Sequence, residues 1–542
     1  MCLKMTSPFK RFGTMIDCSR NAVMNIKSVK NWIDITADLG FNMLMLYTED
    51  TYEVENQPKF GYLRGRYTIE EIKELDTYAE IKGVELIPCI QTLGHLNQLF
   101  YRGEYNNIHD IDDILLVGEE KTYELIDDMF STISKTFKTK VVHIGMDETH
   151  KLGRGKYYDI NGDRDHFKVL EEHLIKVSEI AKKYDFELLM WGDMYFRLCG
   201  GGYYHTLPFP DDIGKLVPDN VRIVYWDYYG DNKDRYLTQI DRHEFIKPNI
   251  WFAGGLWGWT GFAPHNDYSF TVSRPAMQAC REKNVENVFL TLWGDGGGEC
   301  SRYSLLPSLF YACEIAKGNE DNNNIKQKFL EKFGISFDAF MLLDLPLTPN
   351  IERPKGFGDW QVVNMDRYAL FNDCFMGYLD STINIGDGEK FKKNAEELEK
   401  YENNEQFGHI FKTMASLCRV LSLKCDIGVL TRNAYDKKDK NELKKLVSVY
   451  DEILIALDKF YRDFKNQWFI ENKPEGFEIH DARLGGLYFR IRHCKERILD
   501  YIDGKINNIE ELELELLPFR ENADGVPICH NNWKSIISAS QI

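Results

Sequence analysis

Short apolar runs alternate with longer amphipathic stretches through the first two-thirds of the chain. The short runs are typical of buried strands, and the stretches between them repeat apolar residues at helical spacing, as at Val29, Trp32 and Ile33. The predicted strands are 13–17, 41–47, 84–90, 141–146, 186–191, 221–226, 250–254 and 285–293. This alternation predicts a parallel sheet that closes into a (β/α)8 TIM barrel over residues 9–345. A doubly wound open sheet is the alternative, but no Gly-x-Gly-x-x-Gly follows the first strand.

The pattern changes after residue 345. Leu345-Pro346 and Pro349 indicate a linker, and apolar stripes at helical spacing follow it. The stripes are Phe411, Met414, Leu417 and Leu421, and then Leu443, Leu446, Tyr450, Ile453, Leu457 and Phe460. They predict a mainly α-helical C-terminal domain over residues 346–542 that packs on the barrel or pairs subunits. Residues 468–487 are less regular, and we expect them to reach either the active site or an interface.

Polar or aromatic residues end or follow each predicted strand. They are Asp17, Ser19 and Arg20; Glu49 and Asp50; His95; Asp147 and Glu148; Trp191 and Asp193; Trp226, Asp227, Tyr228 and Tyr229; Trp257; Trp293 and Asp295. Barrel active sites lie at the carboxyl ends of the strands, so these side chains should meet there. Carboxylates and arginine hydrogen-bond hydroxyl groups, and indoles cover ring faces, so the set suits a neutral polyhydroxylated ligand.

Two adjacent acids, Asp147 and Glu148, stand at the end of the fourth predicted strand. A buried carboxylate without a partner is costly, although Asp147 could simply cap the next helix. Paired carboxyl groups suggest glycoside hydrolysis. Neighbouring residues of an extended chain point to opposite sides, which disfavours a nucleophile and acid about 5 Å apart. Glu148 as general acid and Asp147 as support for a nucleophile of the substrate, such as a 2-acetamido group, fits better.

Several motifs occur in a matching order on successive strands. Ile16-Asp17-Cys18-Ser19-Arg20, Gly94-His95, His143-Ile144-Gly145-Met146-Asp147-Glu148 and Trp293-Gly294-Asp295 resemble the β-N-acetylhexosaminidases of glycoside hydrolase family twenty. The resemblance covers about residues 10–345 and is nearest to the branch that contains hexosaminidase D. It implies an exo-acting enzyme that hydrolyses terminal β-linked N-acetylglucosamine or N-acetylgalactosamine. Such enzymes are substrate-assisted and retain the anomeric configuration.

The resemblance also implies catalytic roles by position. Asp147 would orient the acetamide and stabilise an oxazolinium intermediate, and Glu148 would protonate the glycosidic oxygen and then deprotonate water. Asp50 and His95 match an Asp-His pair beside the general acid, where they would set its proton position. Arg20 would grip the hydroxyls at carbons three and four of the terminal sugar.

Further residues would bind the substrate. Asp17 would steady Arg20, Asp295 would bind outer hydroxyls, and three tryptophans would wall the acetamide pocket; these are Trp191, Trp226 and Trp293. Where the family commonly has Tyr-x-Asp, this chain has Gly255-Leu256-Trp257-Gly258-Trp259, so the acetamide hydroxyl partner is expected from Tyr228 or Tyr229. Asp227 and Trp257 complete the candidate set.

Charge and cysteine usage restrict partners and compartment. With 85 acidic against 67 basic residues, the net charge is −18, which disfavours nucleic acid and anionic membranes. Twelve cysteines without a Cys-x-x-Cys pair suggest reduced thiols. The first residues have no apolar signal core, and no run reaches the roughly 20 apolar residues of a membrane helix. A cytoplasmic protein is expected, with a homodimer left open.

Three other functions are less well supported. Zinc-dependent deacetylation would use His143, Asp147 and His150, but these lack the His-Glu-x-x-His spacing and an evident third ligand, so neither a metal nor an organic cofactor is expected. A carbohydrate-binding barrel without catalysis would have no need for the acid pair. A different retaining glycosidase for 2-acetamido sugars also remains open.

Overall fold

The computed structural model describes residues 7–347, 365–380, 383–517, 533 and 537–540. Eight parallel strands form a closed barrel in sequence order, which confirms the predicted fold. The strands are β1 Arg11–Asp17, β2 Met43–Glu49, β3 Glu85–Ile90, β4 Val141–His143, β5 Glu187–Trp191, β6 Val221–Trp226, β7 Trp251–Gly255 and β8 Asn287–Leu292. β1 closes the barrel by pairing with β2 on one side and β8 on the other.

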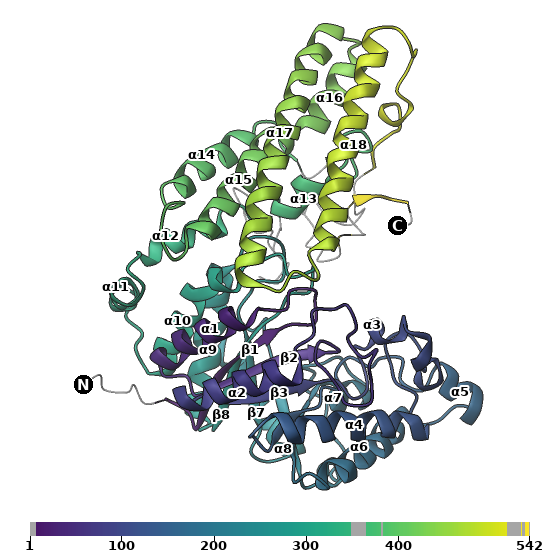
Figure 1. The fold of residues 1–542 in the computed structure, drawn as a ribbon, viewed down its shortest axis with the longest axis vertical. Coiled ribbons are helices and arrows are strands. Elements are labelled where there is room, and N and C mark those ends of the chain that lie inside the picture. The colour runs from purple at the N-terminus through teal and green to yellow at the C-terminus, as the bar shows by residue number, and fades with distance from the viewer. Residues whose placement is uncertain (1–6, 348–364, 381–382, 518–532, 534–536, 541–542) are drawn as a thin grey trace. The chain divides into compact units, whose positions relative to one another are not determined.

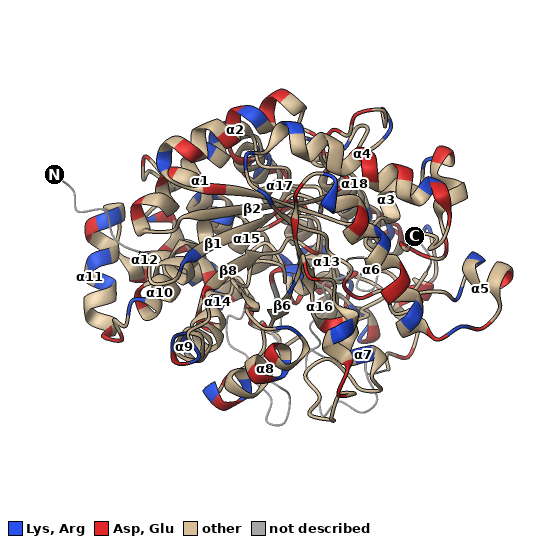
Figure 2. Cartoon of the chain, turned by 90° about the horizontal axis from the view of Figure 1, so that it is seen from below, with Lys and Arg blue, Asp and Glu red and all other residues tan. Residues whose placement is uncertain are grey.

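Helices connect the strands and cover the outside of the barrel (Figures 1 and 2). They are α1 Ile26–Leu39, α2 Ile69–Lys82, α3 Asn97–Phe100, α4 Glu120–Thr136, α5 Lys156–Asn161, α6 His166–Lys182, α7 Asp193–Leu198, α8 Lys233–Ile246, α9 Asn266–Glu282 and α10 Leu306–Ala316, with the 3₁₀ turns η1 Gly103–Ile108, η2 Ile213–Leu216 and η3 Arg302–Leu305. In Figure 2 the charged residues lie mostly on the outer helices, whereas the strands are nearly bare of charge. This is the distribution expected of strands buried on both faces.

Local sequence sets the helix ends. The Thr68 hydroxyl accepts from the Glu71 amide and the Glu71 side chain accepts from the Thr68 amide, a capping box that begins α2. Gly83, in the left-handed conformation, ends the same helix. α1 is bounded in the same way by Asn25 and Gly40. Such signals fix where each barrel helix starts and stops.

The chain divides into two compact units. One holds residues 1–256, 270–293 and 310–320, and the other holds 257–269, 294–309 and 321–542. This division differs from a single boundary at residue 345, because the loops after β7 and β8 belong to the second unit. The remaining helices are α11 Asn322–Phe333, α12 Phe337–Met341, α13 Met365–Phe371, α14 Gly388–Glu399, α15 Gly408–Lys424, α16 Ile427–Asp436, α17 Lys440–Glu471 and α18 Glu478–Ile502, with the 3₁₀ turns η4 Leu342–Asp344 and η6 Glu510–Leu512.

A buried ionic cluster holds the two loops within the second unit. Glu299, on the loop after β8, pairs with Arg367 of α13 and lies 3.1 Å from Arg483 Nη1 of α18. The Asp366 carboxylate accepts from the Phe262 and Ala263 amides on the loop after β7, at 2.5 and 2.9 Å. Buried carboxylates need such partners, so these contacts tie both loops to the helices.

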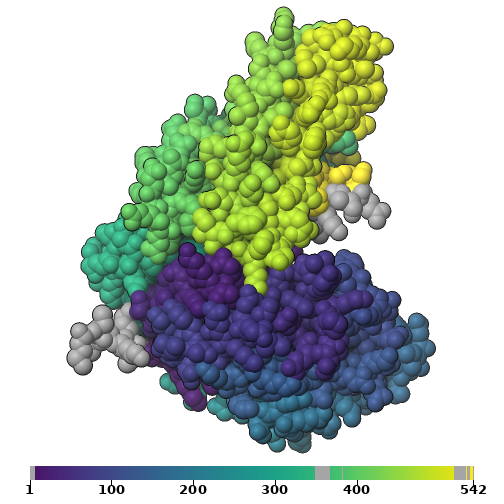
Figure 3. Space-filling view, viewed as in Figure 1, coloured from purple at the N-terminus to yellow at the C-terminus, as the bar shows by residue number. Residues whose placement is uncertain are grey.

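The helical part confirms the predicted stripes. The stripe residues are buried in α15 and α17, and α17 and α18 run side by side (Figures 1 and 3). Residues 468–487 are more regular than expected, since they comprise the end of α17, a short turn and the start of α18. Of the predicted linker residues, Leu345 and Pro346 are described, and Pro349 lies outside the described residues. In the described part, ten cysteines are free thiols and no helix has the length and apolarity to span a membrane.

Candidate active site

The end of β4 places Asp147 and Glu148 in different environments. β4 stops at His143, three residues short of the prediction, because the backbone turns left-handed at Gly145 and Met146, with φ of 73° and 69°. Glu148 is also left-handed, with φ of 51°. The Asp147 side chain is 13% exposed, whereas that of Glu148 is 44% exposed. One acid is therefore held inside the protein and the other is open to a ligand.

Gln91, which the sequence did not single out, positions Asp147. Its Nε2 donates to Asp147 Oδ1 at 2.8 Å, and its Oε1 accepts from the Met146 amide at 3.1 Å. A Cβ on Gly145 would lie 2.0 Å from Gln91 Oε1, so a larger residue there would displace the Gln91 amide, and the positive φ also favours glycine. Gln91 thus fixes both the turn and the carboxylate.

His95 supplies the positive charge of the cluster. Its Nε2 lies 3.2 Å from Asp147 Oδ2, out of line for a good hydrogen bond, and 3.9 Å from Glu148 Oε2. Burial alone would lower the pKa of His95, but the charge of Asp147 outweighs it and raises that pKa. Burial likewise opposes ionisation of Asp147, yet the charge of His95 and the Gln91 hydrogen bond hold the pKa of Asp147 below its usual range. Asp147 is therefore an anion and His95 a cation at neutral pH.

The partner expected for His95 is different in the structure. Asp50 is bound by Arg64, whose Nη2 lies 3.1 Å from Asp50 Oδ1, and the carboxylates near His95 are Asp147, Glu148 and Asp113. Glu49, at the end of β2, is the residue of that strand whose charge raises the pKa of His95. A bulge between Tyr47 and Glu49 explains the exchange, because one extra residue changes which side chains at the strand end face their neighbours. Asp50 therefore pairs with Arg64 in this structure, and its catalytic role beside His95 stays a prediction.

Arg20 sits in an aromatic and acidic setting. Its Nη1 lies 3.3 Å from Glu49 Oε1 and 3.6 Å from Asp17 Oδ2. Its guanidinium carbon lies 5.1 Å from the ring centre of Tyr47 and 5.2 Å from that of Trp293. These contacts hold the guanidinium beside the indole predicted to wall the pocket.

The predicted aromatic residues of the barrel unit gather near the cluster. Trp191 is buried, its ring centre lies 6.3 Å from that of Trp293, and its indole N–H has no hydrogen-bond partner among the described residues. Trp226 stacks on Tyr228 with ring centres 5.3 Å apart. Burial raises the pKa of Tyr228, and the charge of Asp147 adds to the shift. The Tyr228 hydroxyl therefore stays protonated within range of the Asp147 charge.

Asp227 differs from its neighbours because its carboxylate is already hydrogen-bonded to donors within the protein. Arg235 donates from Nε at 2.8 Å and from Nη2 at 3.0 Å, and Tyr225 and two backbone amides also donate to it. These bonds argue against the predicted substrate contact. Trp257 and Asp295 belong to the second unit, so their contacts with substrate stay predictions.

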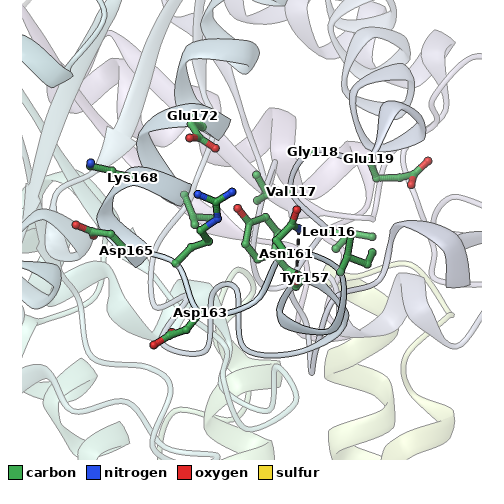
Figure 4. Close-up of a pocket in the computed structure, with 13 residues that line it drawn as sticks. Leu116, Val117, Gly118, Glu119, Tyr157, Asn161, Asp163, Asp165, Lys168 and Glu172 are labelled. Atoms are coloured by element: carbon green, nitrogen blue, oxygen red, sulfur yellow. Dashed lines mark hydrogen bonds between the residues drawn. The ribbon is translucent and has the colours of Figure 1, made fainter.

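A pocket away from these residues lies between α5, α6 and residues 116–119. Figure 4 shows Tyr157 and Asn161 at its centre, joined by a hydrogen bond, with the Glu172 carboxylate above them. None of the predicted catalytic or binding residues lines it. Among the described residues, no group of three His, Cys, Asp or Glu side chains could hold a metal ion.

The buried histidines of the barrel unit predict acid sensitivity. Burial lowers the pKa of His143 and His243 to about 3 and that of His173 to about 4. The unfolded chain binds these protons near pH 6.5, so stability is present above that pH and is lost as the pH falls towards the folded values, by about 1.4 kcal/mol per pH unit for each histidine. Urea unfolding at pH 7 and pH 5 measures the loss. His173→Gln should reduce the difference in unfolding free energy between the two pH values, whereas His493→Gln, at an exposed site, should leave it unchanged. If both variants keep the difference of the wild type, buried His173 does not contribute to the acid sensitivity.

Comparison with known proteins places the chain in a family. Residues 9–246 match the glycosyl hydrolase family 20 catalytic domain, and residues 338–530 match the glycoside hydrolase 20C C-terminal domain. The chain belongs to glycoside hydrolase family 20. The catalytic-domain match of this family 20 chain contains β1 to β6, and with them Asp147, Glu148, His95 and Arg20. Trp257, Trp293 and Asp295 lie beyond it.

Curated relatives of this family 20 chain include human and bovine hexosaminidase D. The human protein is 25% identical over 236 residues, which are 41% of this chain and 46% of the relative. The bovine protein is 25% identical over 235 residues, which are 41% of this chain and 65% of the relative. The matches thus span about half to two-thirds of these relatives. A solved β-N-acetylhexosaminidase from Bacteroides fragilis is 17% identical, covers 60% of this chain and 70% of that chain, and has a TM-score of 0.45.

Proposed function

We propose that this protein is an exo-acting β-N-acetylhexosaminidase that works by substrate-assisted catalysis with retention. The observation that carries the proposal is the unequal pair at the end of β4, in which the Asp147 anion is only 13% exposed and Glu148 is 44% exposed. A fixed anion suits the stabilisation of a cationic intermediate, and an accessible carboxyl group suits proton transfer to a leaving group. The names of the curated relatives, hexosaminidase D among them, agree with this substrate class.

The first step would use the acetamide of the substrate as nucleophile. Its carbonyl oxygen bonds to the anomeric carbon while the bond from that carbon to the leaving oxygen breaks, and Glu148 gives its proton to the leaving oxygen. The product of this step is a cyclic oxazolinium ion. The Asp147 carboxylate would accept from the acetamide N–H and balance the positive charge, because it is already ionised and held in place by Gln91.

The second step would reverse the proton transfer. Glu148, now a carboxylate, takes a proton from water as the water oxygen bonds to the anomeric carbon and the bond to the acetamide oxygen breaks. Two displacements at one carbon restore the original configuration. The terminal sugar leaves as a free N-acetylhexosamine. No metal or organic cofactor takes part in this scheme.

The other residues would bind the terminal sugar. The Arg20 guanidinium, held by Asp17 and Glu49, would donate to ring hydroxyls. Trp191, Trp226 and Trp293 would enclose the acetamide methyl, and the protonated Tyr228 hydroxyl would donate to the acetamide carbonyl.

Substrate choice tests this proposal. We expect the protein to hydrolyse an aryl 2-acetamido-2-deoxy-β-glucoside and to leave the matching plain β-glucoside intact, because the latter has no nucleophile of its own. A thiazoline that mimics the cyclised intermediate should block the reaction. Initial rates on both glucosides with and without the thiazoline measure this. Equal rates on the two substrates would contradict substrate assistance, and binding of the thiazoline without turnover would favour a carbohydrate-binding barrel.

A further inference from the structure

Asp193, at the start of α7, is a fully buried acid that contacts the backbone of Glu148. Its Oδ2 accepts from the Glu148 amide at 3.0 Å, and its side chain has no exposed surface. An aspartate in the first turn of a helix commonly accepts from amides of its own helix. Asp193 instead reaches across to the loop after β4. This bond joins the carboxyl end of β5 to the residue proposed as the general acid.

The environment of Asp193 makes its burial costly. Arg197 Nε lies 3.7 Å from Asp193 Oδ2, but neither that Nε nor Asp193 Oδ1 has a hydrogen-bond partner among the described residues. Burial, with the charges of Asp147 and Glu148 nearby, raises the pKa of Asp193 above its usual range. A group that contributed stability alone would be better paired than this, which indicates a functional reason for its position.

The conformation of Glu148 explains what the contact achieves. A φ of 51° is unfavourable for a residue with a Cβ and persists where the surroundings hold it. The Glu148 side chain is 44% exposed, so packing does little to fix it. Its carboxyl group is therefore placed mainly by its backbone, and the bond to Asp193 holds that backbone.

We propose that Asp193 is a positioning residue that sets the carboxyl group of Glu148 against the leaving oxygen. This inference rests on the proposed function of Glu148 as the general acid. Displacement of a catalytic group by about 1 Å can cost about 100-fold in rate. The loss should be largest where the leaving oxygen most needs a proton.

A series of substitutions tests the role. Asp193→Asn keeps an oxygen that can accept from the Glu148 amide, whereas Asp193→Ala and Asp193→Ser do not reach it. Asp76→Ala is the matched control, because Asp76 is also a buried aspartate that accepts from a backbone amide, that of Lys138, near the amino end of β4. Each variant is assayed for kcat and KM on a 2-acetamido disaccharide and on the activated aryl glycoside, and thermal unfolding checks the fold.

We expect Asp193→Ala and Asp193→Ser to lower kcat on the disaccharide about 100-fold and on the aryl glycoside less than about 10-fold, with KM little changed. Asp193→Asn should retain most of the disaccharide rate. Asp76→Ala should lower stability without an unequal loss of kcat on the two substrates. Equal losses on both substrates, or an Asn variant as poor as the Ala variant, would overturn the inference. If the wild type hydrolyses neither substrate, the proposed function itself is wrong, and the inference about Asp193 is overturned with it because Glu148 is then not a general acid. The Ser variant serves if the Ala variant does not fold.

Discussion

Glu148→Gln should strongly depress hydrolysis of 2-acetamido disaccharides while it largely spares aryl glycosides. Glutamine has nearly the same shape but cannot give a proton to the leaving oxygen. The rate on substrates with an alcohol leaving group should therefore fall by about 10²–10⁴-fold. A phenolate leaving group needs less protonation and should lose far less. Because the Glu148 side chain is 44% exposed, the fold should be unaffected.

The ratio of kcat/KM on the two substrates measures this effect. Glu120→Gln, on an exposed part of α4, is the matched control and should change neither rate. Equal losses on the disaccharide and on the aryl glycoside would remove Glu148 from the role of general acid. Addition of azide gives a second readout, since a small anion should speed the aryl reaction of Glu148→Gln if the missing step is base catalysis of water attack.

Asp147→Asn should depress hydrolysis of both substrates, by about 10²–10³-fold. The oxazolinium ion forms as either leaving group departs, so loss of the Asp147 anion should slow both reactions. Asparagine can still accept from Gln91, and the variant should therefore unfold as cooperatively as the wild type. Rates on both substrates, with a melting curve for each protein, distinguish lost catalysis from lost folding.

A matched substitution separates this effect from the removal of any buried aspartate. Asp76→Asn changes a buried aspartate beside the loop that leads into β4 and should leave both rates near those of the wild type. The thiazoline should also bind more weakly to Asp147→Asn, because its ring nitrogen loses the anionic partner. Rates close to those of the wild type would exclude Asp147 from the mechanism.

The strands were predictable because each one has a strong local signal. β6 has the expected bounds and most others shift by one or two residues. β4 is the exception, since its apolar run continues to Met146 while the strand ends at His143. The early turn depends on Gly145 fitting against Gln91, a residue that directly follows β3. Apolar periodicity does not contain that information.

The acidic residues illustrate the same limit. The resemblance paired Asp50 with His95, whereas in the structure Asp50 pairs with Arg64 and the charge of Glu49 acts on His95, next to a bulge in β2. The periodicity of β2 alone does not reveal the bulge. Asp113 lies in a long loop, yet it accepts from the His95 amide at 3.1 Å. The sequence placed Asp193 at the end of a strand but indicated no role for it. Its contact is with Glu148, which follows a different strand.

The sequence by itself determined the alternation of strands and helices, the barrel that follows from it, and the adjacent acids at the end of the fourth strand. These features depend on residues close together in the chain, where periodicity and turn chemistry act. The tertiary structure decided which acid is buried, which is exposed, and which groups surround His95. Those relations join residues far apart in sequence, and the burial and charge that shift their pKa values exist only once the barrel has closed.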